Sequence, residues 1–290
     1  MFAGFQRKHR LVNGVNIHYR IGGEGPPLLL LHGHPQTHVM WHRVAGQLAK
    51  RFTVVAADLR GYGDSDKPPA SENNHHYSKR VMAQDQIELM SSLGYTQFDI
   101  IAHDRGARVS HRLALDHPET VKRMILLDIA PTLCMYEQTT EQFARAYWHW
   151  FFLIRPAPLP ETLITADPEA YLRQMLFRLS AGENPFTPEA FNEYLRCLSL
   201  PGAAAGTCED YRASAGIDLE HDRHDIAAGN RITCPLLVLW GIEGVIGKLF
   251  DPLEEWKKVA LNVAGAGLPS GHFIPEEVPE ILLEHTWKFL

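Results

Sequence analysis

The stretch Ala102-His103-Asp104-Arg105-Gly106 decides the fold of this 290-residue chain. An apolar run ends at Ala102 and an amphipathic run over residues 107–114 follows, which predicts a buried strand, a sharp turn and a helix. Small residues stand two positions before and two after Asp104. A nucleophile on a tight strand-to-helix turn needs this spacing, because the strand and the helix approach too closely for larger side chains. The stretch therefore predicts a nucleophile elbow with Asp104 at its tip.

The residue at the tip of this elbow is an aspartate rather than a serine. A carboxylate in this position attacks carbon and becomes part of an ester, whereas a serine hydroxyl takes up an acyl group. Asp104 therefore points away from esterases and lipases and towards dehalogenases or epoxide hydrolases.

Strand and helix patterns alternate on both sides of the elbow. Apolar runs predict strands at residues 27–31, 53–58, 98–102, 121–129 and 235–241, with a weaker one near 262–267. An Asn-Gly turn at residues 13–14 predicts a hairpin. Helical periodicity appears at residues 41–50, 77–93, 252–259 and 279–290. This alternation predicts a mostly parallel twisted sheet with helices on both faces. Together with the elbow pattern around Asp104, it predicts the α/β-hydrolase fold.

Residues 132–230 interrupt this alternation. They are rich in Trp, Tyr, Phe and Pro and carry several short helical patterns. About 100 residues are too many for a structureless loop in a compact protein. We expect a helical cap over the strand ends, inserted into a core domain formed by residues 1–131 and 231–290.

Composition excludes several classes of function. The net charge is −6 and the Lys and Arg residues are scattered, which gives no sign of a nucleic-acid surface. The four cysteines form no CxxC pair or zinc framework, so we expect reduced thiols and no metal or other cofactor. No run of about 18 apolar residues predicts a membrane span, and residues 1–22 lack the apolar core of a signal peptide. We expect a cytoplasmic enzyme acting on a small molecule.

Three polar residues lie at the ends of predicted strands in the order nucleophile, acid and histidine. They are Asp104, Asp128 and His272, and this is the order of a hydrolase triad. A histidine is the usual general base near neutral pH. We expect Asp128 to orient His272, and Glu243 remains the alternative acid because it follows the next strand.

The turn His32-Gly33-His34-Pro35 follows the first buried strand. It would place the backbone N–H of His34 beside that of Arg105, and two such donors form an oxyanion hole or a cradle for the nucleophile. Four histidines in this segment suggest a metal cluster: His32, His34, His38 and His42. No acidic or cysteine ligand is nearby and the turn already explains the segment, so we expect no metal there.

Arg105 and Arg108 lie three residues apart at the start of the elbow helix and share one face. Cations at a helix N-terminus oppose the helix dipole, so this pair calls for an anion. A substrate carboxylate held by guanidinium forks would supply one. The alternative is that both arginines pair with carboxylates of the protein or point to solvent.

At these residues the chain resembles the fluoroacetate (haloacetate) dehalogenases of the α/β-hydrolase superfamily, over residues 5–290. The motifs that carry the resemblance are residues 32–36, 58–65, 103–106, 147–150, 208–212 and 217–222. The sequence differs from the family at His34, where Phe or Tyr is usual, and at Ala107, where Gly is common.

The resemblance implies a role for each candidate residue. Asp104 would be the nucleophile, His272 the base and Asp128 the acid. Arg105 and Arg108 would hold the substrate carboxylate. The departing halide would lie among three side chains of the cap, His149, Trp150 and Tyr211. The resemblance also implies a homodimer.

The expected reaction is hydrolytic dehalogenation of a short 2-haloacid through an aspartyl ester. An epoxide hydrolase is the alternative, because it shares the aspartate nucleophile and the turn that follows the first buried strand. It would need cap tyrosines to protonate the epoxide, and the candidates are Tyr147, Tyr171, Tyr194 and Tyr211. A third hypothesis is a ligand-binding homologue without catalytic activity. Such proteins often lose a catalytic residue, whereas all three residues of the expected triad are present in this sequence.

Overall fold

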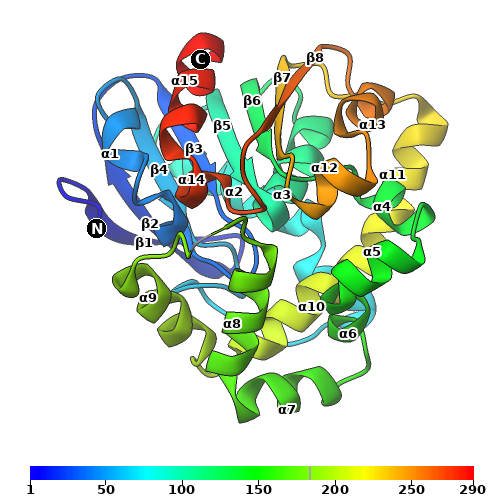
Figure 1. Ribbon diagram of the computed structural model, residues 1–290. Helices are drawn as coiled ribbons and strands as arrows, with labels where there is room; N and C mark the ends of the chain where they lie inside the picture. Colours follow the sequence, from blue (N-terminus) through cyan, green and yellow to red (C-terminus); the bar gives the residue numbers. More distant parts are fainter. Residues whose placement is uncertain (183) are drawn as a thin grey trace.

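One eight-stranded sheet runs through the computed structural model, which describes residues 1–182 and 184–290 (Figure 1). Its strand order is β1-β2-β4-β3-β5-β6-β7-β8. The strands are β1 (Gln6–Val12), β2 (Val15–Gly22), β3 (Pro27–Leu31), β4 (Thr53–Ala57), β5 (Phe98–His103), β6 (Val121–Leu127), β7 (Leu236–Gly241) and β8 (Val263–Leu268). Strand β2 is antiparallel to β1 and β4, and the other neighbours are parallel. The predicted hairpin and mostly parallel sheet are confirmed.

The central strands are apolar on both faces because both faces are covered. In β3 the side chains of Leu28 and Leu30 join one hydrophobic cluster, and those of Leu29 and Leu31 join the other. All four leucines are fully buried. A parallel strand sandwiched between two helical layers requires this continuous apolar run rather than an alternating one.

Helices on the two faces complete these clusters. One face is packed by α1 (Ala45–Leu48) and α15 (Pro279–Phe289). The other is packed by α2 (Lys79–Ser92), α3 (Asp104–Asp116) and α13 (Pro252–Val259). Short helices η1 (His38–Trp41), η2 (Glu72–Tyr77), α12 (Val245–Leu249) and α14 (Ile274–Glu277) lie in the connections. The helix predicted over residues 41–50 is wrong in extent, because only η1 and α1 form there and Val44 and Gly46 are poor helix formers.

Eight helices lie between β6 and β7 in the described residues, and no strand interrupts them. They are α4 (Thr132–Glu137), α5 (Glu141–Ala146), α6 (Trp148–Leu153), α7 (Leu159–Ala166), α8 (Pro168–Leu179), α9 (Pro188–Leu198), α10 (Ala203–Ala215) and α11 (Ile217–Ala228). In Figure 1 most of them gather below the sheet, in green to yellow. The helical insertion occurs where a cap is expected, and its treatment as a separate domain stays a prediction.

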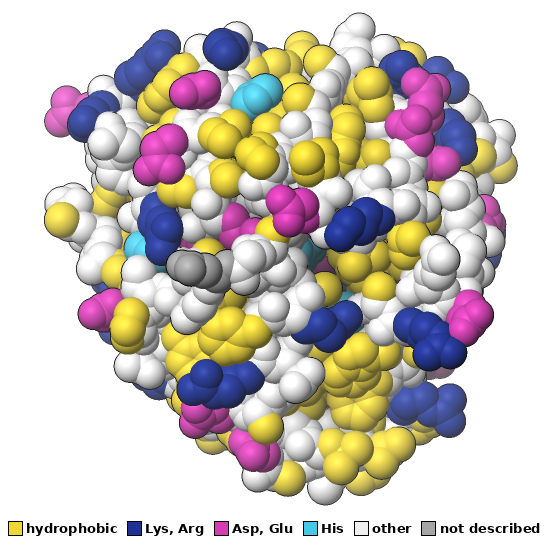
Figure 2. Space-filling view, viewed as in Figure 1, with side chains coloured by type: hydrophobic (Ala, Val, Ile, Leu, Met, Phe, Trp, Pro, Cys, Tyr) yellow, Lys and Arg dark blue, Asp and Glu magenta, His cyan; other side chains and the backbone are white. Residues whose placement is uncertain are grey.

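The surface carries charges of both signs. Figure 2 shows Lys and Arg side chains interspersed with Asp and Glu across one face. Within the described ranges, no helix combines the length and the apolar character needed to cross a membrane.

Candidate active site

Strand β5 ends at His103 and helix α3 begins at Asp104, so the predicted strand-turn-helix is confirmed. Asp104 has a φ of 43°, a conformation that non-glycine residues rarely adopt, and this directs its side chain out of the turn. A Cβ on Gly106 would lie 2.5 Å from the carbonyl oxygen of His32, and one on Gly33 would lie 2.4 Å from the Asp104 Cβ. The two glycines are therefore required by close approach at the elbow.

The backbone of the opposite loop holds the Asp104 carboxylate. The N–H of His34 donates to its Oδ1 atom at 2.9 Å, which provides the His34 half of the expected cradle. Burial alone would raise the pKa of Asp104, but the nearby positive charges of His272 and Arg105 outweigh it and hold this pKa below its usual range. Asp104 is therefore an ionised carboxylate, and its Oδ2 atom accepts no hydrogen bond from the residues that the structure describes.

Asp128 is the acid that contacts the histidine. Its Oδ2 atom lies 2.6 Å from Nδ1 of His272, and its Oδ1 atom accepts a hydrogen bond from the N–H of Gly241 at 2.9 Å. The alternative acid, Glu243, is exposed. Burial would lower the pKa of His272, but the hydrogen bond and charge of Asp128 raise it above its ordinary value. Asp128 therefore fixes both the orientation and the basicity of the imidazole.

The loop that carries His272 is held at three points. The N–H of His272 donates to the carbonyl of Leu179 at 2.9 Å, and Nε2 of His103 donates to the carbonyl of His272 at 2.8 Å. A Cβ on Gly271 would lie 2.5 Å from the Leu179 oxygen, so the glycine before the histidine is needed for close approach. Phe273 is fully buried behind the loop. These contacts place the His272 ring 4.4 Å, centroid to centroid, from that of His103, the residue before the nucleophile.

Arg105 is fully buried, but its fork is already occupied. Nε and Nη2 donate to Oδ2 and Oδ1 of Asp210 at 2.8 and 2.9 Å. The alternative stated above, in which the arginine pairs with a carboxylate of the protein, is therefore correct for Arg105. Its Nη1 atom is buried with no hydrogen-bond partner in the part of the chain that the structure describes. Arg105 therefore offers one nitrogen, rather than the expected fork, to a bound anion.

Arg108 has no carboxylate partner among the residues described. Nη1 donates to the carbonyl of Ala130 at 3.2 Å and to the Thr132 hydroxyl at 2.9 Å, and Nη2 lies 3.2 Å from the Met135 sulfur. Its Nε is buried and, within the described ranges, unpartnered. Burial and the charge of Arg105 lower the pKa of Arg108 from its ordinary value. An anion placed at Nε would relieve this unbalanced charge.

The three cap residues expected around a halide lie against the arginines. The Arg105 guanidinium lies 4.1 Å from the ring centre of Tyr211, and that of Arg108 lies 4.8 Å from Trp150. The ring of His149 is 5.9 Å from that of Tyr211. Nε1 of Trp150 and Nδ1 of His149 are buried without a partner in the described structure. The structure thus brings all three side chains together with both guanidinium groups.

His34 adds a polar ring to the same cluster. Its Nε2 atom lies 3.0 Å from the Tyr171 hydroxyl, and its ring stacks 6.4 Å from that of His149. Burial lowers the pKa of His34 to about 3, so the imidazole is neutral. Of the other tyrosine candidates, Tyr194 donates its hydroxyl to Glu276 at 3.1 Å and is engaged elsewhere.

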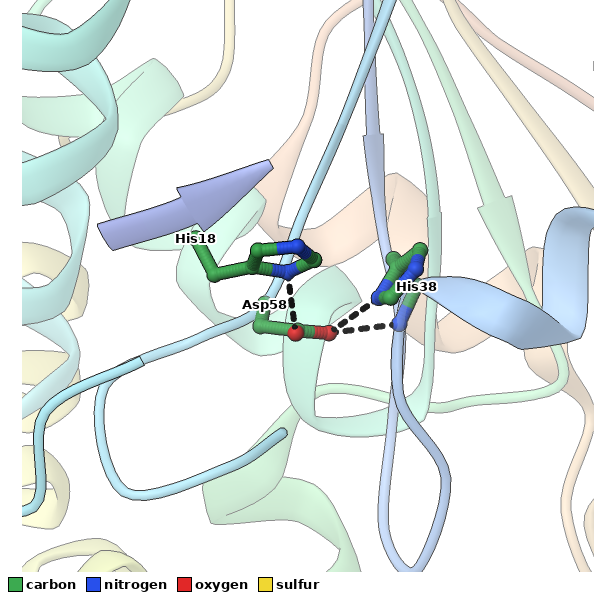
Figure 3. Close-up of side chains that lie close together, drawn as sticks. All are labelled: His18, His38 and Asp58. Atoms are coloured by element: carbon green, nitrogen blue, oxygen red, sulfur yellow. Dashed lines mark hydrogen bonds and ion pairs between the residues drawn. The ribbon is translucent and has the colours of Figure 1, made fainter. Parts of the chain in front are cut away.

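A histidine cluster that includes His38 is built around Asp58 (Figure 3), so the expectation that no acidic residue lies near the histidine segment is wrong. Nδ1 of His18 and of His38 lie 2.7 and 2.9 Å from different oxygens of the carboxylate. Nε of Arg7 donates to Nε2 of His18 at 3.2 Å, and Nε of Arg20 lies 3.5 Å from Nε2 of His38. Both Nδ1 atoms therefore carry the proton and donate to Asp58. We interpret the cluster as a hydrogen-bonded junction between β2 and η1 rather than as a metal site. Nδ1 of each histidine, which would have to bind a metal beside Asp58, carries a proton instead.

Comparison with known proteins agrees with this geometry. A family model described as alpha/beta hydrolase fold matches residues 26–269. The chain belongs to the α/β-hydrolase family. It is 47% identical to a fluoroacetate dehalogenase from Burkholderia sp over 100% of this chain and 95% of that protein. It is 37% identical to a soluble epoxide hydrolase from Corynebacterium sp. (strain C12), over 96% and 95% of the two chains. The solved structure of ALR0039 from Nostoc sp PCC 7120 covers 100% of this chain and 99% of its own, with 55% identity and a TM-score of 0.98.

These comparisons confirm the predicted fold and the predicted likeness to haloacetate dehalogenases. Sequence reasoning missed the partners of Arg105, which are Asp210 and Ser214. One signal was present, since Asp210 immediately precedes the candidate Tyr211. An arginine that needs an anion could have been matched to this neighbouring carboxylate as well as to a substrate.

Proposed function

We propose that this hydrolase cleaves the carbon–halogen bond of short 2-haloacids, haloacetates first among them, through an ester of Asp104. The observation that carries the proposal is the cluster of buried, unpartnered N–H groups beside an ionised nucleophile. These groups are Nη1 of Arg105, Nε of Arg108 and Nε1 of Trp150, with no partner among the described residues. Leaving such donors unpaired is costly unless a ligand satisfies them, and donors of this kind suit an anion.

The substrate carboxylate would bridge the two arginines. Arg105 supplies Nη1 and Arg108 supplies Nε, one donor from each side chain. This arrangement would direct the α-carbon towards Asp104. Orientation of the reacting atoms can contribute about 7–11 kcal/mol to catalysis.

In the first step Oδ2 of Asp104 attacks the α-carbon in line with the halogen. A C–O bond forms, the carbon–halogen bond breaks, and the halide leaves with the electron pair. Oδ2 is the attacking oxygen because Oδ1 accepts the N–H of His34, whereas Oδ2 has no hydrogen-bond partner among the described residues. Trp150, His149 and Tyr211 would donate hydrogen bonds to the halide as its charge develops.

In the second step His272 removes a proton from water and the hydroxide attacks the ester carbonyl. The N–H of His34 is positioned to stabilise the oxyanion that forms at Oδ1. When the intermediate collapses, the Cγ–Oδ2 bond breaks, the departing alkoxide oxygen takes the proton from His272 to give the 2-hydroxy acid, and the Asp104 carboxyl loses its proton to water. Asp128 holds the imidazole in the required tautomer throughout.

Epoxide hydrolysis is the second candidate, because the similarity to the Corynebacterium enzyme supports it. It would use the same attack by Asp104, with Tyr147 and Tyr211 as proton donors. Their rings lie 5.1 and 5.9 Å from that of His149. The two buried guanidinium groups favour an anionic substrate over a neutral epoxide.

Halide release from fluoro-, chloro- and bromoacetate tests the proposal, with diol formation from styrene oxide measured in parallel. We expect halide release by the wild type and none by a folded Asp104→Asn variant. Diol formation without halide release would replace the proposal by the epoxide hydrolase. Turnover of neither substrate class, with a carboxylate still raising the Tm, would favour a ligand-binding protein.

A further inference from the structure

The Asp210 carboxylate lies at the centre of a buried ion network that joins the helical insertion to the core. Asp210 belongs to α10 and is fully buried. It accepts both bonds from the Arg105 fork, a bond from the Tyr62 hydroxyl at 2.6 Å, and one from Nζ of Lys79. Each carboxylate oxygen thus has two donors. The orientation of Arg105 is set by a residue 105 positions away in the sequence.

This network fixes which nitrogen of Arg105 is free. Nη2 also donates to the Asp210 carbonyl at 3.0 Å and to the Ser214 hydroxyl, so Nε and Nη2 are both engaged. Nη1 is the only guanidinium nitrogen of Arg105 without a partner in the described residues. The Tyr211 ring, adjacent in sequence to Asp210, lies 4.1 Å from the guanidinium and restricts its position further.

Lys79 is a second cation in contact with the Asp210 carboxylate. Its Nζ contacts Asp210 and lies 3.4 Å from Oδ2 of Asp218. The backbone N–H of Lys79 donates to the other oxygen of Asp218 at 2.8 Å. Negative and positive groups therefore alternate from Asp218 through Lys79 and Asp210 to Arg105. The Asp210 carboxylate is thus shared between Lys79 and Arg105 rather than paired with Arg105 alone.

We propose that Asp210 is a positioning residue for substrate recognition, which aims Nη1 of Arg105 at the substrate carboxylate while Lys79 offsets its charge. This inference rests on the proposed function for the identity of the substrate. It assigns the helical insertion a part in carboxylate binding in addition to its part in halide binding. It also makes the ion pair between Asp210 of α10 and Arg105 of α3 a condition for holding the substrate.

The direction in which Asp210→Asn changes the affinity for an anion distinguishes a positioning role of Asp210 from a purely electrostatic one. Asp210→Asn removes a negative charge close to the site, which by Coulomb attraction alone would tighten the binding of an anion. Loss of the paired, charge-assisted bonds would instead release the Arg105 side chain and weaken that binding. The two explanations therefore predict changes in opposite directions.

The experiment measures binding of acetate to the whole protein by thermal shift and by competitive inhibition, with KM and kcat for chloroacetate alongside. In Asp210→Asn we expect acetate to bind about tenfold more weakly or worse, with a matching rise in KM that exceeds the change in kcat. Unchanged or tighter acetate binding would overturn the proposal. A fall in Tm without a change in KM would equally show a purely structural role.

Tyr62→Phe is the matched control, because it removes one neutral donor to the same carboxylate and leaves the Arg105 fork intact. We expect its acetate affinity to stay within about threefold of the wild type.

Lys79→Met tests the charge offset: weaker acetate binding supports it and wild-type affinity contradicts it. If Asp210→Asn does not fold, Asp210→Glu keeps the negative charge but displaces the carboxylate by one methylene from the Arg105 fork, which leaves Arg105 itself unchanged. Weaker binding then supports positioning and wild-type affinity overturns it.

Acetate has no leaving group, so this test does not depend on turnover. If acetate binding depends on Asp210 but no haloacetate releases halide, the positioning role stands and only the proposed reaction falls. If halide is released and acetate affinity does not depend on Asp210, the proposed reaction stands and the positioning role falls.

Discussion

Nδ1 of His272 lies 2.6 Å from Oδ2 of Asp128, and both groups are buried. The hydrogen bond raises the pKa of the imidazole above its ordinary value of 6.5. Because His272 must be neutral to accept a proton from water, hydrolysis of the ester requires a pH above this raised pKa. The two residues together therefore set the pH below which kcat falls.

We predict that kcat falls on the acid side with a midpoint above 6.5, the ordinary value for histidine. Asp128→Asn should lower kcat by about 10³- to 10⁴-fold and move that midpoint to lower pH, because the charge that raises the pKa is gone. The pH profile of steady-state turnover measures both effects. His34→Phe is the control: His34 has a pKa of about 3 and is already neutral, so its replacement should leave the midpoint in place.

The base is needed for the second step only, and this gives a separate prediction. His272→Gln should still release halide from bromoacetate, but only once per active site, because the ester can no longer be hydrolysed. Mass spectrometry of the intact protein should show a carboxymethyl adduct of about 58 Da. Multiple turnovers at the wild-type rate would mean that another group activates water.

The close approach at the elbow makes a prediction about stability. Gly106→Ala would place a Cβ against backbone atoms at 2.5 Å that cannot move independently, and we expect a loss of about 1–3 kcal/mol in the free energy of unfolding. Gly46→Ala is the matched control in α1, where a Cβ meets nothing within 4 Å. That change should be neutral or stabilise by about 0.5–1 kcal/mol. Equal effects of the two substitutions in urea unfolding would contradict the packing argument.

The buried carboxyl group of Glu276 should make the free energy of unfolding depend on pH. It is fully buried and bonds to Gln36 and Tyr194, and burial raises its pKa from 4.5 to about 8. Between these values the folded chain holds a proton that the unfolded chain has released. The free energy of unfolding therefore falls as pH rises through this window, by as much as ~5 kcal/mol from this group.

Glu276→Gln should remove that contribution, so that the variant gains stability over the wild type as pH rises from 4.5 to about 8. Urea unfolding of both proteins across this range measures the difference. Glu280→Gln, a change at an exposed position on α15, should run parallel to the wild type. A constant difference between Glu276→Gln and the wild type would show that the carboxyl is not held protonated.

The parts of the site that could be predicted are those that follow a local pattern. The elbow requires small residues at fixed spacing around Asp104. The ends of parallel strands meet at one edge of a sheet, and this rule predicted that Asp128 and His272 lie together although 144 positions separate them in the sequence. Asp210 and Lys79 meet across 131 positions with no such pattern, because only the packing of the helical insertion on the core brings them into contact. For the same reason the engaged fork of Arg105 was only an alternative in the sequence analysis, and Asp210 was not named as its partner.

The central claim is that Asp104 attacks carbon directly and becomes an ester, and heavy-oxygen labelling tests it most directly. Wild-type protein in excess over chloroacetate, in water enriched in oxygen-18, should incorporate the label into the Asp104 carboxylate during one turnover, because water attacks the ester carbonyl. Mass spectrometry of the peptide that contains Asp104 locates the label. Label found in the hydroxy acid product and absent from Asp104 after one turnover would show that water attacks the substrate directly, and would contradict the account.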